Sequence, residues 1–311
     1  MRVSIIGLEH LGVVTAACAA NHHDIKIWDG RPEIISLLLR GLKTWPHEEP
    51  GINSGFIANL VAHNLASILD QAVEGAEIIW VTYDTPVSDD EMPNYVWVSD
   101  RIQEIFPLLK LGQILLISSQ VCCGFTEMIQ TALYKTGVNV GVYCSPENIR
   151  RGRALETFCH QKRILVGASD DVMSVDDSEK ITALLTPFCE KVMWLPARVA
   201  EMSKHVLNAF LAMTIAFTNE VGTLCELYDV SPAHIQQALI SEGRIGIGLP
   251  LRYGEPYSGG TLGRDVETLN FLTRAKTRYL PLLKTINASN DLHKVRCEQK
   301  PTTDIEAASA D

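Results

Sequence analysis

The chain has 311 residues, of which 46% are hydrophobic and 21% are charged, and this suits a globular protein of two domains with sizeable cores. Its formal net charge at pH 7 is −10. This acidic balance disfavours nucleic acid and anionic membranes as partners.

The N-terminal part of the chain alternates between two kinds of segment. Apolar or β-branched runs predict strands at 3–7, 24–29, 77–83, 113–119, 138–146 and 162–169. Helices are predicted at 11–20, 33–41 and 98–110. Strands that alternate with helices indicate βαβ units and a parallel sheet with both faces covered. The fold class is therefore α/β, and we expect a Rossmann-like doubly wound parallel sheet in a dinucleotide-binding domain over residues 1–196.

A mostly helical domain is expected over residues 197–290. Residues 197–228 contain no strong helix breaker, only Gly222, and they are apolar around most of the helix circumference, which is typical of a core or a subunit interface. Shorter helices are predicted at 231–240 and, as one closing helix, at 265–290. The polar residues 291–311 are expected to form a disordered tail.

The cysteines and the N-terminus favour a cytoplasmic protein. The eight cysteines form no CxxC pair, so we expect reduced thiols and no metal site. The apolar start of the chain imitates a signal peptide, but Glu9 and His10 interrupt it, and a strand, turn and helix fit better. No stretch reaches the roughly 18 uninterrupted apolar residues of a membrane span.

The stretch GLEHLG (7–12) follows a strand and opens a helix, as a dinucleotide-binding glycine motif does. Gly7 and Gly12 are in place, and Asp29 follows at the spacing of the acidic residue that binds ribose hydroxyls, which favours NAD over NADP. Asp29 alone is equally typical of an ordinary strand end. Glu9 replaces the middle glycine, and its charge would repel a diphosphate. Three outcomes stay open: weakened NAD binding, tolerated binding with Glu9 turned to solvent, or loss of binding.

Several motifs together resemble the UDP-glucose/GDP-mannose dehydrogenase family. They occur in the family's order over about residues 1 to 285, as VSIIGLEHLGVVTAACAA, EPGI, TP (85–86), SPENIRRGRA, EMSKHVLNAFLAMTIAFTNE, GRIG and YSGGTLGRD. The resemblance implies an NAD-binding Rossmann domain and a long central helix used in dimerisation. It also implies that a nucleotide-sugar alcohol is oxidised to a carboxylate in two hydride transfers. The family's third domain has no room in this sequence.

The resemblance assigns three sets of site residues. The catalytic set is Lys204, Asn208, Asp265, Glu147 and Thr261. The cofactor-binding set is Gly7, Glu9, His10, Leu11, Gly12, Asp29, Thr85, Ser119, Gln120 and Arg264. The substrate-binding set is Glu147, Arg151, Arg244, Tyr253 and Gly259.

The reacting pair is retained. Lys204 and Asn208 are four residues apart, which places both on one face of a helix. A lysine stabilises a developing alkoxide and an asparagine holds a water or an oxyanion. The alternative for Lys204 is a side chain that extends along the apolar helix to reach the surface.

Other family positions are changed. Thr261 stands where the family has its nucleophilic cysteine, and a threonine hydroxyl is a poor substitute for a thiolate. Cys122 and Cys123 are alternative nucleophiles or, as an ordinary structural role, small buried hydrophobes. Arg151 and Arg264 replace a carboxylate and a lysine, so they create a site for an anionic ligand or are solvated arginines.

These residues predict an NAD-dependent oxidoreductase limited to a two-electron interconversion of an alcohol and a carbonyl. The substrate would be a small anionic or sugar-like molecule, and the protein would be a homodimer through its central helix. The alternative is a non-catalytic dimeric binding or scaffold relative with weak or no NAD binding.

Overall fold

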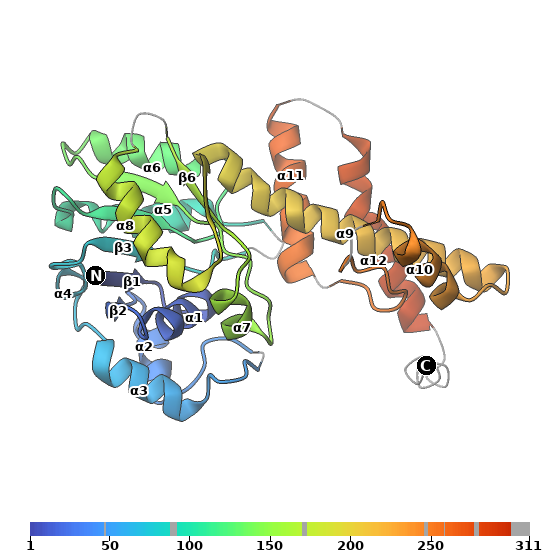
Figure 1. Cartoon of the computed structure of the whole chain (residues 1–311), viewed down its shortest axis with the longest axis horizontal. Helices are drawn as coiled ribbons and strands as arrows, with labels where there is room; N and C mark the ends of the chain where they lie inside the picture. Colours follow the sequence, from blue (N-terminus) through green and yellow to red (C-terminus); the bar gives the residue numbers. More distant parts are fainter. Residues whose placement is uncertain are drawn as a thin grey trace. The chain divides into compact units, whose positions relative to one another are not determined.

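The computed structural model describes residues 1–46, 48–87, 92–169, 173–245, 248–257, 259–276 and 280–299 (Figure 1). The chain divides into two compact units. Unit 1 comprises Met1–Val87 and Asn94–Lys204, and unit 2 comprises Ser88–Pro93 and His205–Asp311. Each unit is described by itself.

Unit 1 contains a sheet of seven strands in the order β2-β1-β3-β4-β5-β6-β7. The strands are β1 (Arg2–Ile6), β2 (Asp24–Trp28), β3 (Ile78–Val81), β4 (Ile114–Ile117), β5 (Gly141–Cys144), β6 (Ile164–Ala168) and β7 (Val192–Pro196). All neighbouring strands are parallel except β5 and β6, which pair antiparallel through Cys144 and Gly167. The expected parallel sheet is therefore confirmed, with one antiparallel pair.

Alternate residues of the strands contribute to two separate cores. Val3 and Ile5 of β1 belong to one apolar cluster, and Ile6 belongs to the other. Because successive side chains of a strand point to opposite faces, each face of the sheet needs its own cover.

Helices cover both faces. The first cluster includes residues of α1 (His10–Ala19), α2 (Pro32–Leu39), α3 (Ser54–Asn64), α7 (Ala154–Cys159), α8 (Val175–Leu185) and η2 (Thr186–Phe188). The second includes residues of α4 (Leu69–Val73), α5 (Tyr95–Gln103), η1 (Phe106–Leu108) and α6 (Phe125–Tyr134). This is the doubly wound arrangement that the sequence predicts.

The strand order reverses at β1. The chain runs from β1 to β2 on one side and then to β3 on the other side of β1. In open α/β sheets, ligands bind outside the carboxyl ends of the strands at such a reversal. The turn after β1 and the segment after β3 therefore form the first place to look for a site.

Helix α9 (Ala197–Leu227) begins in unit 1 and continues into unit 2, which is helical as expected. Unit 2 also contains α10 (Pro232–Ser241), η3 (Gly259–Gly263), α11 (Arg264–Ala275) and α12 (Pro281–Gln299). Within the described part of the chain, none of the helices has the length and apolarity needed to cross a membrane.

One expected element is wrong. The single closing helix over 265–290 is two helices, because α11 ends at Ala275 and α12 begins at Pro281. Proline lacks the backbone N–H of a helix interior, and its ring disfavours helical geometry in the preceding residue. A disordered tail is expected from residue 291, whereas α12 includes residues up to Gln299. Residues 300–311 lie outside the described residues.

Candidate functional site

The turn between β1 and α1 depends on both of its glycines. Gly7 has a φ of +100°, and a Cβ atom added there would lie 2.6 Å from the backbone nitrogen of Tyr83. A Cβ atom at Gly12 would lie 1.7 Å from the carbonyl oxygen of Gly7. Helix α1 therefore packs directly on the turn, as the glycine motif requires.

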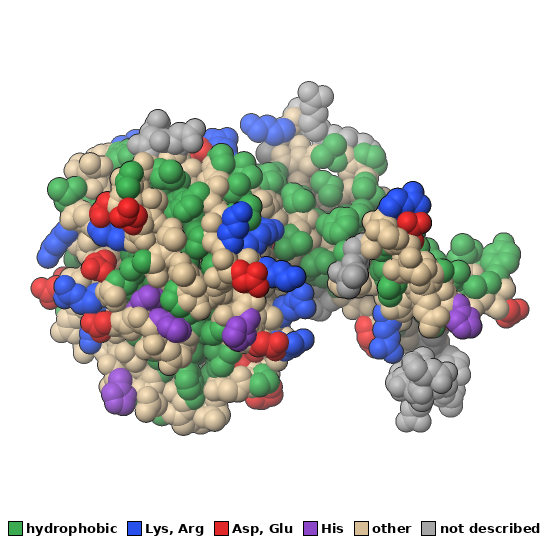
Figure 2. All heavy atoms as spheres, in the orientation of Figure 1, with side chains coloured by type: hydrophobic (Ala, Val, Ile, Leu, Met, Phe, Trp, Pro, Cys, Tyr) green, Lys and Arg blue, Asp and Glu red, His purple; other side chains and the backbone are tan. Residues whose placement is uncertain are grey.

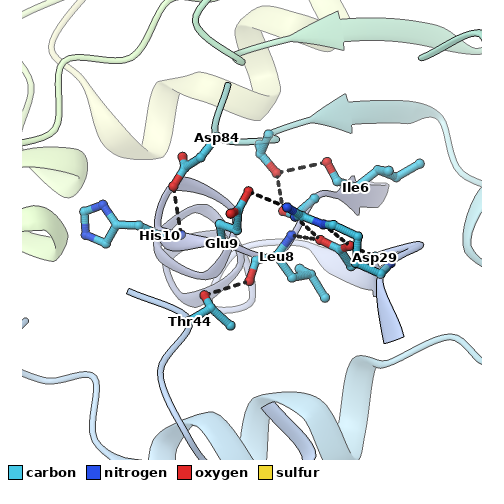
Figure 3. Close-up of polar contacts among 10 residues, drawn as sticks. Ile6, Leu8, Glu9, His10, Asp29, Thr44 and Asp84 are labelled. Carbon is cyan, nitrogen blue, oxygen red and sulfur yellow. Dashed lines mark hydrogen bonds and ion pairs between the residues drawn. The ribbon is translucent and has the colours of Figure 1, made fainter. Parts of the chain in front are cut away.

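Asp29 follows β2 and joins this turn. Its Oδ2 accepts the backbone N–H of Leu8 at 2.7 Å, and its side chain is buried. The structure thus brings the glycine turn and Asp29 together at the carboxyl edge of the sheet, as the sequence spacing predicts (Figure 3).

Glu9 is paired with a cation. Its Oε2 lies 2.9 Å from a guanidinium nitrogen of Arg31, and Glu9 stands at the N-cap of α1. Burial raises the pKa of Glu9, with Arg31 opposing and Asp84 adding to the rise. Since 24% of the Glu9 side chain is exposed, it is neither fully turned to solvent nor buried in the turn.

Three residues near the turn were missed by sequence reasoning. Arg31 pairs with both Asp29 and Glu9. Asp84 accepts the backbone N–H of His10 at 3.2 Å (Figure 3). Glu49 lies within the EPGI motif, and its Oε1 lies 2.9 Å from Nε2 of His10. Two of these residues had a signal in the sequence. Arg31 lies two residues after Asp29, and Glu49 is the first residue of the EPGI motif.

The other predicted cofactor residues of unit 1 are buried. Thr85 follows β3, and Ser119 and Gln120 follow β4, at the same edge of the sheet. The hydroxyl of Thr85 donates to the carbonyl of Gln120 at 2.5 Å. Leu11 is also buried, within α1. The hydrogen bond between Thr85 and Gln120 connects the segments that follow β3 and β4.

Glu147 is a buried carboxyl group of the candidate catalytic set. Its side chain is buried, Gln161 donates to its Oε2 at 3.3 Å, and its Oε1 has no hydrogen-bond partner among the described residues. Burial raises the pKa of Glu147 to about 7, although Gln161 and the positive charge of Lys204 oppose the rise. A carboxyl group with this pKa can both accept and release a proton near neutral pH.

Neither cysteine after β4 is activated. Burial raises the pKa of Cys122 to about 11, and it also raises the pKa of Cys123. The nearby charge of Glu201 contributes to both increases. Thiols in such surroundings are poorly ionised and are therefore weak nucleophiles at neutral pH.

Unit 2 contains a buried group centred on Asp265. One oxygen of Asp265 lies 2.6 Å from Nδ1 of His205, and the other accepts the side-chain amide of Asn208 at 2.5 Å. All three side chains are buried. Asp265 therefore fixes the orientation of Asn208, one turn after Lys204 on α9.

Thr261 and Gly259 lie in the π-helical turn η3, directly before Arg264 at the start of α11. Thr261 and Arg264 are half-buried. A π-helical turn is rare and is frequently found at functional sites.

The remaining predicted substrate residues lie in different surroundings. Arg151 is exposed in unit 1. Arg244 is exposed in unit 2 and pairs with Glu242 at 3.0 Å. The Tyr253 ring packs on Gly222, where an added Cβ atom would lie 2.1 Å from it, and its hydroxyl donates to Glu226 at 2.8 Å. Within the described ranges, no group of three or more His, Cys, Asp or Glu side chains could hold a metal ion.

The fold and the glycine turn define a dinucleotide-binding protein of the Rossmann class. Residues 1–188 match the UDP-glucose/GDP-mannose dehydrogenase family's NAD binding domain, and residues 198–292 match the same family's central domain. The chain belongs to the UDP-glucose/GDP-mannose dehydrogenase family.

Curated relatives agree with this membership. The chain is 28% identical to a UDP-glucose 6-dehydrogenase of Pseudomonas aeruginosa, with 94% of this chain and 66% of the relative covered. It is 29% identical to a UDP-glucose 6-dehydrogenase of Rhizobium meliloti, with 94% and 68% covered. The chain thus spans about two thirds of the length of these relatives.

Solved structures share the fold. A UDP-glucose dehydrogenase of Pyrobaculum islandicum has a TM-score of 0.82 at 23% identity, with 94% of this chain and 68% of that chain covered. A UDP-D-ManNAc dehydrogenase of Pyrococcus horikoshii has a TM-score of 0.81 at 21% identity, with 99% and 72% covered.

Proposed function

We propose that the chain is an NAD-dependent oxidoreductase that interconverts an alcohol and a carbonyl by a single two-electron step. The observation that carries the proposal is the buried Glu147 carboxyl group, whose pKa of about 7 matches the needs of proton transfer at neutral pH. The family membership supports the redox class, because the relatives are named as dehydrogenases.

The backbone of unit 1 fits NAD. Gly7, with a φ of +100°, permits the tight turn after β1, and Gly12 lets α1 pack directly on that turn, as the dinucleotide-binding motif requires. Asp29 lies where a carboxylate would accept ribose hydroxyls, and the N-terminus of α1 offers N–H groups to a diphosphate. When bound, NAD supplies the acceptor for a hydride.

The chain's own residues would handle the proton and the developing charge. Lys204 would stabilise the alkoxide that forms as the substrate hydroxyl loses its proton. Glu147, on which the charge of Lys204 acts, would accept that proton. Asn208, held by Asp265, would orient a water or the substrate oxygen.

We propose that the oxidation stops at the carbonyl. A second oxidation requires a nucleophile that holds the aldehyde as a tetrahedral adduct. Thr261 offers only a hydroxyl, and burial raises the pKa values of Cys122 and Cys123. We expect a small anionic or sugar-like substrate, because Arg151 and Arg264 replace a carboxylate and a lysine of the family pattern.

The protein is proposed to be a cytoplasmic homodimer. On α9, Phe210, Phe217 and Leu224 recur every seven residues, and their exposed fractions are 45%, 56% and 54%. Side chains at this spacing share one helix face, and a second copy of the chain would remove them from water. Light scattering of wild type and Phe217→Glu tests this proposal, since the charged variant should be monomeric.

One observation favours a second candidate, a non-catalytic binding or scaffold relative. Both carboxylate oxygens of Asp29 are already engaged by groups of the chain itself. Product analysis decides between the two functions. We expect one NADH per substrate molecule and a carbonyl product, and Lys204→Ala should abolish turnover. Two NADH and an acid product would overturn the two-electron proposal, and no NAD binding at millimolar concentration would favour the non-catalytic relative.

A further inference from the structure

The side chains above the glycine turn form a closed network in which Asp29 has no acceptor capacity left. Its Oδ1 accepts the backbone N–H of Arg31 at 3.0 Å and Nε of Arg31 at 2.9 Å. Its Oδ2 accepts the N–H of Leu8 at 2.7 Å and Nη2 of Arg31 at 2.8 Å. A carboxylate offers about four lone-pair positions. Ribose hydroxyls can therefore donate to Asp29 only after the Arg31 side chain has left it.

Arg31 is held on several sides. Its guanidinium lies 2.9 Å from Oε2 of Glu9, and it stacks over the rings of Trp97 and Tyr83, at 5.2 Å and 5.6 Å from their centroids. Only 18% of the Arg31 side chain is exposed. Although burial opposes it, the hydrogen bonds and charges of Asp29 and Glu9 raise the pKa of Arg31 further above its ordinary range. The cation thus bridges the two carboxylates that flank the turn.

A third carboxylate stands at the N-terminus of α1. Oδ2 of Asp84 accepts the backbone N–H of His10, the first residue of that helix, at 3.2 Å (Figure 3). A helix N-terminus attracts anions, and in dinucleotide-binding folds the diphosphate takes this position. In this chain the carboxylate of Asp84 already accepts a hydrogen bond at that position.

We propose that Glu9 and Arg31 form a gate over the dinucleotide site, with Asp84 as the internal anion behind it. The gate is closed while Arg31 bridges Glu9 and Asp29, and a dinucleotide binds only to the open form. This proposal rests on the proposed function and adds a means of regulating cofactor binding. Since only the open fraction of molecules can bind, the apparent affinity equals the affinity of the open form multiplied by that fraction.

The physical consequence is that Glu9 sets the affinity for the adenosine half of the cofactor. With Glu9 neutral, Arg31 loses one of its two charged partners, and one negative charge near the diphosphate disappears. The guanidinium is then held by Asp29 alone, and a phosphate oxygen can take the place of the Glu9 carboxylate beside it. Both changes act in the same direction, toward tighter binding.

The test is binding of ADP-ribose, measured by calorimetry with the full chain. ADP-ribose contains the adenosine and the diphosphate but no nicotinamide, so the readout does not depend on turnover. We expect Glu9→Gln to tighten binding by about tenfold or more, because a closed gate reduces the competent fraction. Asp84→Asn should tighten it as well, by removing the internal anion.

Glu33→Gln is the matched control. Glu33 is exposed in the first turn of α2, two residues after Arg31, and the substitution changes the net charge by the same amount. We expect its affinity for ADP-ribose to remain within about twofold of wild type, because solvent and salt screen the exposed charge of Glu33.

Equal affinities of Glu9→Gln and wild type would overturn the gate, and so would the absence of binding to both. Failure of the proposed function has a different signature. If the chain binds NAD without oxidising any alcohol, the Glu9→Gln effect on ADP-ribose persists, and only the catalytic proposal is lost.

Discussion

His10 and Glu49 form a buried pair in which Nε2 and Oε1 lie 2.9 Å apart. Glu49 also accepts the backbone N–H groups of Gly152 at 2.7 Å and Ala154 at 2.9 Å. One carboxylate therefore connects the first residue of α1 to the N-terminus of α7. The glycine turn is positioned by this connection as well as by its own backbone.

Replacement of this carboxylate should destabilise unit 1 in a pH-dependent way. Although burial favours the neutral form, the N–H groups of Ala154 and Gly152 and the charge of His10 lower the pKa of Glu49. A lowered folded-state pKa contributes stability above the ordinary value of 4.5, and this stability is lost as pH falls through the folded-state value. We expect Glu49→Gln to lose about 2 kcal/mol near neutral pH. Urea denaturation should show the difference from wild type shrinking in acid, and a difference independent of pH would contradict this reasoning.

The Glu147 carboxyl group should give folding stability the opposite pH dependence to Glu49, so that stability falls as pH rises. Because burial raises its pKa from 4.5 to about 7, the wild type should lose stability as pH rises between these values. The difference between about 7 and 4.5 corresponds to about 3 kcal/mol at roughly 1.4 kcal/mol per pH unit. Glu147→Gln removes the ionisation and should be more stable than wild type at alkaline pH.

Thermal unfolding at pH values on both sides of neutrality measures the Glu147 effect. Glu156→Gln is the control, because Glu156 lies on helix α7, is exposed and pairs with the exposed Arg153. Its stability should change little with pH relative to wild type. A Glu147→Gln profile parallel to wild type would show that the carboxyl group is already neutral or is solvated.

The glycine turn predicts a sharp contrast between two glycine-to-alanine substitutions. A Cβ atom at Gly12 would lie 1.7 Å from the carbonyl oxygen of Gly7, so Gly12→Ala should destabilise the chain by at least about 2 kcal/mol. Gly55 is exposed near the start of α3, where an added Cβ atom lies 3.5 Å from Oδ1 of Asn53. Gly55→Ala should be neutral or stabilising by up to about 0.5 kcal/mol, because it restricts the unfolded chain. Chemical denaturation compares the two, and equal effects would mean that α1 can shift away from the turn.

The elements that the sequence predicts correctly are those encoded locally. The runs around Ile5, Trp80 and Leu115 are β-branched or apolar and are bounded by turns, and the structure has strands there. The glycine turn was also predictable, because the spacing of Gly7, Gly12 and Asp29 is a local signature.

The partners of the site residues were not predictable in this way. Arg31 is close to Asp29 in sequence, but its pairing with Glu9 depends on how β1 and β2 lie in the sheet. Asp84 and Glu49 reach the start of α1 from distant segments. The EPGI motif marks Glu49, but no local pattern in the sequence specifies that Glu49 and Asp84 contact the start of α1. Charge alone predicts that Glu9 repels a diphosphate, and the structure adds that Glu9 is paired with Arg31.

Figure 2 shows acidic and basic side chains interspersed over the visible face, so no single-sign field there would steer a ligand. The local balance at the turn therefore matters more than the net charge. The Arg31 guanidinium pairs with two carboxylates, Glu9 and Asp29, and the charge of a third, Asp84, acts on Glu9. An incoming diphosphate would meet a net negative site as long as all three are ionised.

The last prediction is that affinity for ADP-ribose rises as pH falls. Burial raises the pKa of Glu9, with Arg31 opposing the rise and the carboxylates of Asp84 and Asp29 adding to it. Glu9 therefore becomes neutral at a higher pH than an ordinary glutamate, and its neutral form holds Arg31 less strongly and no longer repels the ligand. Calorimetric titrations across mildly acidic and neutral pH should show tightening toward acid for wild type, and a flat profile for Glu9→Gln. If wild type and variant show the same pH profile, another group controls the site and the charge of Glu9 is not what limits binding.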